Sequence, residues 1–283
     1  MALIHVDFFS NSLMRTVPIK VILPTDKHLG NGEKISKEKK LFKTLYLLHG
    51  VFGSDIDWIS GTRVQAWAES YNLAVVMPAG ENKFYVDNNA SGDNFSKFIG
   101  EELVDFTRAT FPLSEKREDT FIGGLSMGGY GALINGLKYY QTFGRICAFS
   151  SALVIEKYKN ADNSAEELID KRSFYESFWG PFDALEGSDK DYYALADKTA
   201  ENGECPEIYA ACGKQDMLLG YNQKFICHLK EKGYLVTYEE WEGGHDWFFW
   251  DQCIKRVMEW LPLGKAEMGI SSGHTTLDEK KET

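Results

Sequence analysis

The residues best suited to chemistry lie in the pentapeptide 124–128, which has the pattern G-x-S-x-G with Ser126 at its centre. An apolar run at 119–123 precedes it and predicts a strand, and helical periodicity follows at 126–140. A serine at a tight strand-to-helix turn projects its hydroxyl toward a substrate, and the flanking glycines let strand and helix pack closely. The N-terminal end of the helix also favours negative charge that develops there. Ser126 is therefore our candidate nucleophile.

The motif alone leaves other interpretations of this turn open, because a glycine-rich turn can serve packing only or can cradle a phosphate. A P-loop needs a lysine directly after its glycines, and none follows here. A dinucleotide fingerprint belongs to the first strand-turn-helix unit of its sheet, which is not the position of this motif. The apolar strand before the turn and the helix after it are the context that a nucleophilic serine requires.

A serine hydroxyl becomes a good nucleophile only when a base takes its proton, and His245 is the best candidate among six histidines. It lies in a glycine-rich turn between the last predicted strand and the last predicted helix, from which its side chain can reach over the sheet. A helix-capping or surface role is the alternative. His49 ends a predicted strand beside the site, where we expect it to shape a loop. The remaining histidines lie in a strand, a loop, a helix and the tail; they are His5, His28, His228 and His274.

The histidine in turn needs an acid that fixes its tautomer and stabilises the imidazolium. Asp216 follows the second-last predicted strand, so the chain order is Ser126, Asp216, His245. Asp246 is a rival, but its adjacency to His245 makes a good contact with the ring nitrogen Nδ1 unfavourable. A simple turn or helix cap is the alternative role for Asp216.

Two backbone amides should form an oxyanion hole for the reacting carbonyl oxygen. One is the N–H of Met127, the residue after the nucleophile. The other should come from the glycine-containing loop at 49–53, which follows the first buried strand. We predict Val51 as this donor, with Phe52 as the second choice.

The elements that position these residues are predicted from periodicity. A hairpin of strands at 4–9 and 16–23 comes first, and a charged loop at 26–40 follows. Apolar runs then alternate with amphipathic stretches, a pattern typical of βαβ units and a mainly parallel sheet with helices on both faces. The expected strands are 44–48, 73–77, 119–123, 145–150, 207–212 and 235–241, and the expected helices are 58–71, 94–111, 126–140, 221–232 and 247–260.

The alternation breaks after the sixth strand, where a polar and aromatic segment predicts an insertion with short helices at 151–203. We expect this insertion to act as a lid. The expected organisation is one α/β domain over 1–262, because no linker-like segment divides it, followed by a flexible tail at 263–283.

Composition excludes several classes of protein. The formal net charge of −11 disfavours a nucleic-acid partner, which normally requires a basic surface. No apolar stretch approaches the roughly 18 residues of a membrane span. Five cysteines without C-x-x-C spacing indicate reduced thiols and no metal site, and the first residues show no export signal. These features predict a cytoplasmic protein.

Three segments together show a family resemblance: residues 45–53, 75–78 and 122–131, the last reading Ile-Gly-Gly-Leu-Ser-Met-Gly-Gly-Tyr-Gly. Over about residues 1–262 the chain resembles the esterase D-like hydrolases. Within that group it is most similar to bacterial tributyrin esterases, which are similar to the feruloyl and acetylxylan esterases of carbohydrate esterase family 1. The resemblance implies an α/β-hydrolase fold with eight or nine strands, a triad at Ser126, Asp216 and His245, and ester hydrolysis without a metal or cofactor.

The sequence therefore predicts a serine carboxylesterase for short-chain acyl, hydroxycinnamoyl or acetyl-sugar esters, with a small-molecule ester or an acylated oligosaccharide as its partner. An S-formylglutathione hydrolase-like thioesterase, an acyltransferase or peptidase on the same fold, and a catalytically inactive binding module are the alternatives. The choice between a monomer and a homodimer stays open.

Several aromatic residues are expected at the substrate pocket, because they fall in loops at the predicted carboxyl ends of strands or in the insertion. Each is more often a core residue when it is considered alone. Trp179 is the one expected in the lid. The predicted pocket residues are Phe52, Trp58, Tyr85, Trp179 and Trp247.

Overall fold

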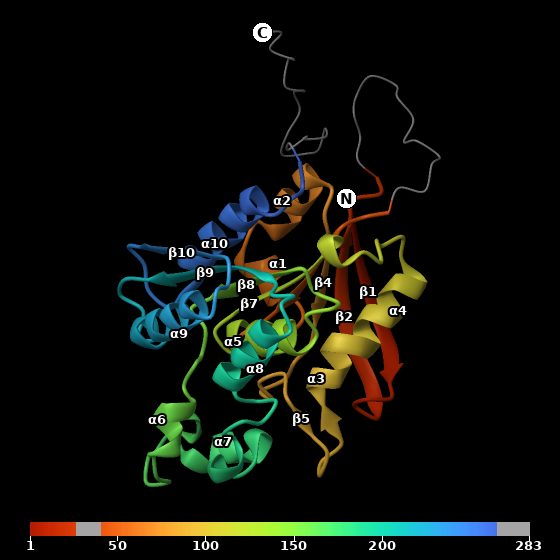
Figure 1. Cartoon of the computed structure of the whole chain (residues 1–283). Coiled ribbons are helices and arrows are strands. Elements are labelled where there is room, and N and C mark those ends of the chain that lie inside the picture. Colours follow the sequence, from red (N-terminus) through yellow and green to blue (C-terminus); the bar gives the residue numbers. More distant parts are fainter. Residues whose placement is uncertain (27–40, 265–283) are drawn as a thin grey trace.

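The computed structural model describes residues 1–26 and 41–264, and an eight-stranded sheet runs through its centre (Figure 1). The strand order is β1-β2-β4-β3-β7-β8-β9-β10. Along one edge, β1 (Ala2–Ser10), β2 (Arg15–Leu23) and β4 (Ala74–Pro78) pair antiparallel. All other neighbours pair parallel; the remaining strands are β3 (Thr44–Leu48), β7 (Thr120–Leu125), β8 (Arg145–Phe149), β9 (Glu207–Gly213) and β10 (Val236–Trp241). The predicted mainly parallel sheet is confirmed.

The continuous apolar runs form central strands because both faces of this sheet are covered. In β3, Leu45 and Leu47 belong to the hydrophobic core on one face, and Tyr46 and Leu48 belong to the core on the other. Alternate side chains of a strand point to opposite faces, so a strand covered on both sides favours apolar residues along its length.

Helices form a layer on each face of the sheet (Figure 1). One layer contains α1 (Asp57–Gly61), α2 (Val64–Tyr71) and α10 (Trp247–Trp260). The other contains α3 (Phe95–Lys97), α4 (Leu103–Thr110), α5 (Met127–Lys138), α8 (Tyr192–Glu201) and α9 (Leu219–Glu231). The carboxyl ends of the parallel strands meet at one edge of the sheet, and the loops there carry the candidate site.

Two predicted helices are interrupted. The helix expected at 58–71 is α1 followed by α2, with Thr62 and Arg63 between them. The helix expected at 94–111 is α3, a π-helical turn at Phe98–Glu102 and then α4. A small hairpin, β5 (Asp87–Asn88) with β6 (Asp93–Asn94), was not predicted. Two-residue strands have no periodicity that a sequence pattern could reveal.

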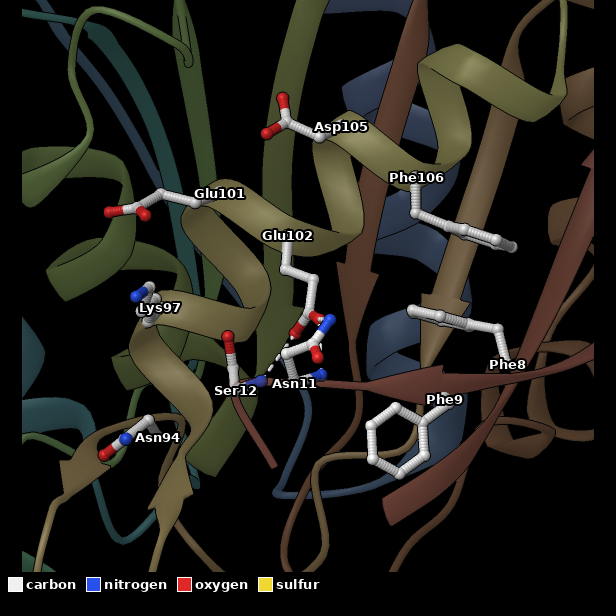
Figure 2. A pocket seen from close by; sticks show the side chains of 10 residues that line it. All are labelled: Phe8, Phe9, Asn11, Ser12, Asn94, Lys97, Glu101, Glu102, Asp105 and Phe106. Carbon is white, nitrogen blue, oxygen red and sulfur yellow. Dashed lines mark hydrogen bonds between the residues drawn. The ribbon is translucent and has the colours of Figure 1, made fainter. Parts of the chain in front are cut away.

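The π-helical turn directs Glu102 toward the connection between β1 and β2, at a surface cleft (Figure 2). Its carboxylate accepts hydrogen bonds from the Ser10 hydroxyl at 2.6 Å and from the backbone N–H groups of Asn11 and Ser12 at 2.6 and 3.1 Å. Burial alone would raise the pKa of Glu102, but these donors hold it below its usual value. Glu102 therefore fastens the N-terminal hairpin to the helical layer.

The segment between β8 and β9 contains α6 (Ile155–Lys159), α7 (Arg172–Trp179) and α8. Aromatic rings anchor α7 to the rest of the protein. The Phe84 ring stacks on Phe178 with centroids 4.8 Å apart, and Trp179 contacts Phe84 and Tyr130 at 5.2 and 5.6 Å. The segment contains short helices, and its assignment as an insertion remains a prediction. The predicted loop at 26–40 and tail at 263–283 lie, except for their first residues, outside the described part of the chain.

Candidate active site

Ser126 lies between the end of β7 and the start of α5 in a conformation that few residues adopt. Its backbone φ and ψ are 53° and −117°. A side chain at positive φ costs energy, which the surrounding contacts must offset. The Ser126 N–H donates to the Phe149 carbonyl at 2.9 Å, and its own carbonyl accepts from the Ala152 N–H at 2.9 Å. Both neighbours lie at or just after β8, so the sheet itself holds the serine in this turn.

The two glycines of the motif are required by close packing. A Cβ atom on Gly124 would lie 2.4 Å from the Gly128 carbonyl oxygen, and one on Gly128 would lie 2.4 Å from the Leu48 carbonyl oxygen. These distances are below any real contact of a Cβ atom, and the atoms met are backbone. Glycine at both positions therefore lets α5 start directly over the end of β3.

A chain of hydrogen bonds joins Ser126, His245 and Asp216. The Ser126 Oγ lies 3.0 Å from His245 Nε2, and His245 Nδ1 lies 2.9 Å from Asp216 Oδ2. Asp216 follows β9 and His245 follows β10, and these strands are parallel neighbours. The two loops are also joined, since the Gln215 N–H donates to the Gly243 carbonyl at 3.0 Å. Three residues far apart in sequence thus meet at the carboxyl edge of the sheet.

The Asp216 carboxylate is buried and remains anionic. Burial alone would raise its pKa, but the hydrogen bond and electrostatic interaction with His245, together with hydrogen bonds from the Leu218 N–H and the Ser150 hydroxyl, lower the pKa below its usual value. The Leu218 N–H donates to Oδ1 at 2.8 Å and leaves Oδ2 for the histidine. The rival acid Asp246 is engaged elsewhere, because it caps α10 by accepting from the Phe249 N–H at 3.0 Å.

Trp250 supports this arrangement and was not predicted. Its ring meets the His245 ring edge to face, with centroids 4.9 Å apart, and its Nε1–H donates to the Ser150 Oγ at 3.2 Å. Trp250 lies three residues after Trp247 on α10, and residues three apart lie on the same face of a helix. The helical periodicity of 247–260 could therefore have predicted that both rings face the site.

The two predicted oxyanion donors are the N–H groups of Val51, in the loop after β3, and of Met127, at the start of α5. Within the described part of the chain, neither the Val51 N–H nor the Met127 N–H has a protein acceptor. The Phe52 N–H, the second choice, donates to the Asn82 side chain at 2.8 Å and is therefore occupied. Asn82 has no sequence signal that would have revealed this contact.

His49 holds the loop at 49–53 in its conformation through two hydrogen bonds. The Gly80 N–H donates to its Nε2 at 2.8 Å, so Nδ1 carries the proton and donates to the Gly50 carbonyl at 2.7 Å. Burial lowers the pKa of His49, mainly because the charged form would lose its hydration. A neutral histidine with both nitrogens engaged orients the loop, as expected, and has no position free for proton transfer.

A cavity of about 410 Å³ opens above Ser126. Phe52, which is 74% exposed, and Trp247 belong to its wall. The lining residues are Gly50, Val51, Phe52, Gly53, Asp57, Leu125, Ser126, His245, Trp247 and Trp250.

The predicted pocket needs correction for Trp58, Tyr85 and Trp179, whose side chains are buried and do not line this cavity. The Trp58 Nε1–H donates to the Leu48 carbonyl at 2.9 Å, and the Tyr85 hydroxyl donates to the His49 carbonyl at 3.0 Å. Trp179 packs in the aromatic contacts that anchor α7. All three lie in or near loops, but their rings pack inward because large apolar surfaces gain more from burial than from exposure.

The described residues contain neither a metal-binding cluster nor a membrane-spanning helix. No cluster of three or more histidine, cysteine or acidic side chains that could hold a metal ion was found among residues 1–26 and 41–264. In the same residues, no helix is both long enough and apolar enough to cross a bilayer.

Comparison with known proteins identifies the family of this chain. The chain matches the model of a family described as putative esterase over residues 10–260. It is 45% identical over 262 residues to an acetyl esterase of Caldicellulosiruptor saccharolyticus, covering 92% of this chain and 98% of the relative.

Two solved structures of Staphylococcus aureus proteins are also similar. An S-formylglutathione hydrolase has 31% sequence identity and a TM-score of 0.77, and fluorophosphonate-binding serine hydrolase F has 30% identity and a TM-score of 0.79. Each match covers 92% of this chain and 98% of the other. The family match spans most of the chain and includes Ser126, Asp216 and His245. This chain therefore belongs to the putative esterase family and is a carboxylic ester hydrolase with an α/β-hydrolase fold.

Proposed function

We propose that this esterase hydrolyses short-chain acyl esters, acetyl esters among them, with Ser126 as nucleophile, His245 as general base and Asp216 as the acid that orients the histidine. The observation that carries this assignment is the hydrogen-bond chain of 3.0 and 2.9 Å from Ser126 through His245 to Asp216. The Asp216 carboxylate at one end is buried, and Ser126 at the other end lines the cavity. Nucleophilic catalysis requires this arrangement, because the serine must reach the substrate while the acid orients the histidine from behind.

In the proposed reaction, His245 Nε2 takes the hydroxyl proton while Ser126 Oγ attacks the ester carbonyl. The Val51 and Met127 N–H groups donate to the oxyanion of the tetrahedral intermediate. The intermediate expels the alcohol, which receives the proton from His245, and the acyl group stays on Ser126. Water then attacks the acyl-enzyme with His245 again as base, and the acid leaves as Ser126 regains its proton.

The acetyl part of the proposal draws on the acetyl esterase relative, which shares 45% of its residues with this chain. Acetylated or hydroxycinnamoylated oligosaccharides extend the proposed substrates, because Phe52 and Trp247 give the cavity aromatic surfaces and carbohydrate rings stack on such surfaces. A cytoplasmic location remains a prediction from the sequence, and the choice between a monomer and a homodimer stays open.

A second candidate is a thioesterase that releases formate from S-formylglutathione. Similarity to the S-formylglutathione hydrolase of Staphylococcus aureus and, at 28% identity over 234 residues, to that of the mouse favours it. The same triad would act on a thioester, so the leaving group separates the two candidates. Acyl transfer to added alcohols and cleavage of amides test the remaining enzymatic alternatives.

Replacement of the nucleophile tests the assignment directly. Ser126→Ala should lower turnover of p-nitrophenyl acetate by roughly 10⁴–10⁶, because the acyl-enzyme can no longer form. The exposed Ser91 offers a matched control, and Ser91→Ala should retain full activity. A fluorophosphonate probe should label the wild-type protein and the Ser91 variant but not Ser126→Ala. Retention of most activity by Ser126→Ala would refute the assignment, and an unlabelled wild type would favour an inactive binding module.

A further inference from the structure

The cavity above Ser126 contains a carboxylate that the proposed mechanism does not use. Asp57 is the first residue of α1 and belongs to the cavity wall. Among the described residues that line the cavity, Asp57 and His245 are the only two with an ionisable side chain. A charged group beside the reacting ester must interact with the substrate, either favourably or unfavourably.

Asp57 has no cationic partner among residues 1–26 and 41–264. Its Oδ1 accepts a hydrogen bond from the Ser54 hydroxyl at 3.3 Å, and no ion pair joins Asp57 to a cation among the described residues. Asp55, two positions earlier, shows the contrast: it is buried and paired with Lys20 at 2.7 Å. The Asp57 carboxylate therefore keeps acceptor capacity for a group that enters the cavity.

The surrounding structure holds this carboxylate in place. A Cβ atom on Gly53 would lie 2.0 Å from Asp57 Oδ2, so the glycine leaves the space that the carboxylate occupies, against the loop that carries Val51. The last residue of α1 packs against Trp247 of the cavity wall, since a Cβ atom on Gly61 would lie 2.4 Å from the Trp247 ring. Trp247 also meets the Trp58 ring edge to face at 5.6 Å. The helix that bears Asp57 is thus packed against the cavity wall at both ends.

We propose that Asp57 determines specificity for the alcohol part of the ester, by accepting a hydrogen bond from a hydroxyl of the alcohol and by repelling alcohols that carry a carboxylate. This inference rests on the proposed function. In an acetyl ester the acyl part is a single methyl group beyond the carbonyl, so a group that reaches Asp57 across a cavity of this size belongs to the alcohol. The same repulsion acts against glutathione, whose two carboxylates make it an anionic leaving group.

A structural role is the simpler alternative for Asp57, because an acidic residue in the first turn of a helix interacts favourably with the backbone N–H groups there. That role predicts equal effects of a substitution on all substrates. A specificity role predicts effects that depend on the alcohol. The ratio of kcat/KM between paired esters therefore separates the two roles, since stability and general activity cancel in the ratio.

Two pairs of acetyl esters provide the test. Glycerol monoacetate and propyl acetate differ in the hydroxyls of the alcohol, and O-acetyl lactate and its methyl ester differ in one negative charge. Wild type should prefer glycerol monoacetate by roughly tenfold or more, as for a hydrogen bond to a charged acceptor, and should prefer the methyl ester over O-acetyl lactate. Asp57→Asn should lower the hydroxyl preference roughly fivefold to tenfold and abolish the discrimination against the anion, because the amide accepts a hydrogen bond without charge.

Asp105→Asn is the matched control. Asp105 is exposed, lines the separate cleft of Figure 2 and undergoes the same change of charge. It should leave both ratios at their wild-type values. All measurements are made at about 1 M salt, where long-range repulsion between the protein and an anionic ester is screened.

The outcomes are distinguishable. Ratios that are the same in wild type and Asp57→Asn, or that change equally in Asp105→Asn, overturn the role of Asp57 while Ser126-dependent hydrolysis stands. If Asp57→Asn does not fold, wild type alone decides, since equal rates within both pairs overturn the inference. A wild type that cleaves none of the four esters overturns the proposed function and this inference with it.

Discussion

At the scale of single residues, the site depends on positions where no side chain fits. Gly128 is the sharpest case, because an added Cβ would lie 2.4 Å from the Leu48 carbonyl oxygen and 2.6 Å from that of His49. These two backbone atoms belong to the end of β3 and to the loop that presents Val51. A substitution at Gly128 therefore moves the nucleophile and the predicted oxyanion donor relative to each other.

Gly128→Ala should destabilise the protein by about 1–3 kcal/mol, the usual cost of overpacking. It should also lower kcat/KM for p-nitrophenyl acetate by about 100-fold or more, because a misplacement of about 1 Å in a catalytic site has that effect. Urea unfolding and steady-state kinetics measure the two effects. Gly220→Ala is the control: a Cβ there would meet no atom within 4 Å, so stability should stay equal or rise. Normal activity in Gly128→Ala would show that the close packing is not needed.

At the scale of elements, α7 is an anchored helix. The sequence predicted Trp179 as a lid residue because it lies in the segment that interrupts the regular alternation of strands and helices. In the structure its indole is 2% exposed and contacts Phe84, Tyr130 and Tyr175. A residue that anchors a segment affects stability before it affects substrate choice, and the lid function of the insertion as a whole remains a prediction.

Trp179→Ala should lower the free energy of unfolding by about 3–5 kcal/mol, as expected for a buried aromatic residue replaced by alanine. The ratio of kcat/KM between acetyl and butyryl esters should stay unchanged, because the indole does not line the cavity. Leu168→Ala in the same insertion is the control, since Leu168 is 61% exposed and should contribute less than about 0.5 kcal/mol. A changed acyl preference with unchanged stability would instead restore Trp179 as a lid residue.

At the scale of the whole molecule, the order of strands joins the two halves of the chain. β7, which leads to Ser126, lies in the same sheet as β9 and β10, which lead to Asp216 and His245. This arrangement supports the predicted single domain over 1–262 with an insertion at 151–203, and those boundaries remain a proposal. The net charge of −11 is likewise a property of the whole molecule.

This charge predicts how salt affects catalysis. Between about 0.01 M and about 1 M salt the screening length falls from about 30 Å to about 3 Å. For a neutral ester such as p-nitrophenyl acetate, kcat/KM should change little over this range. For the anionic O-acetyl lactate it should rise several-fold, because screening removes long-range repulsion. Initial rates across the salt series measure both slopes, and a steep slope for the neutral ester would contradict the prediction.

Much of this protein was determined by the sequence alone. The apolar runs at 44–48 and 119–123 predicted central strands because a strand covered on both faces needs apolar residues throughout, and the structure confirms them with bounds within two residues. The order Ser126, Asp216, His245 could be predicted because each residue follows a strand, and parallel strands bring their carboxyl ends to one edge. The positions of strands can be predicted in this way because they depend on the residue types of neighbouring positions.

Only the tertiary structure decided which side chains face the cavity. Phe52 and Trp58 both follow β3, yet one ring is 74% exposed and the other 1%. Asn82 accepts a hydrogen bond from the Phe52 amide, and Trp250, which packs against His245, donates to Ser150; both hydrogen bonds join residues distant in sequence. The physical reason is that the path of the backbone follows local periodicity, whereas the direction of a loop side chain is set by whichever distant surfaces pack around it.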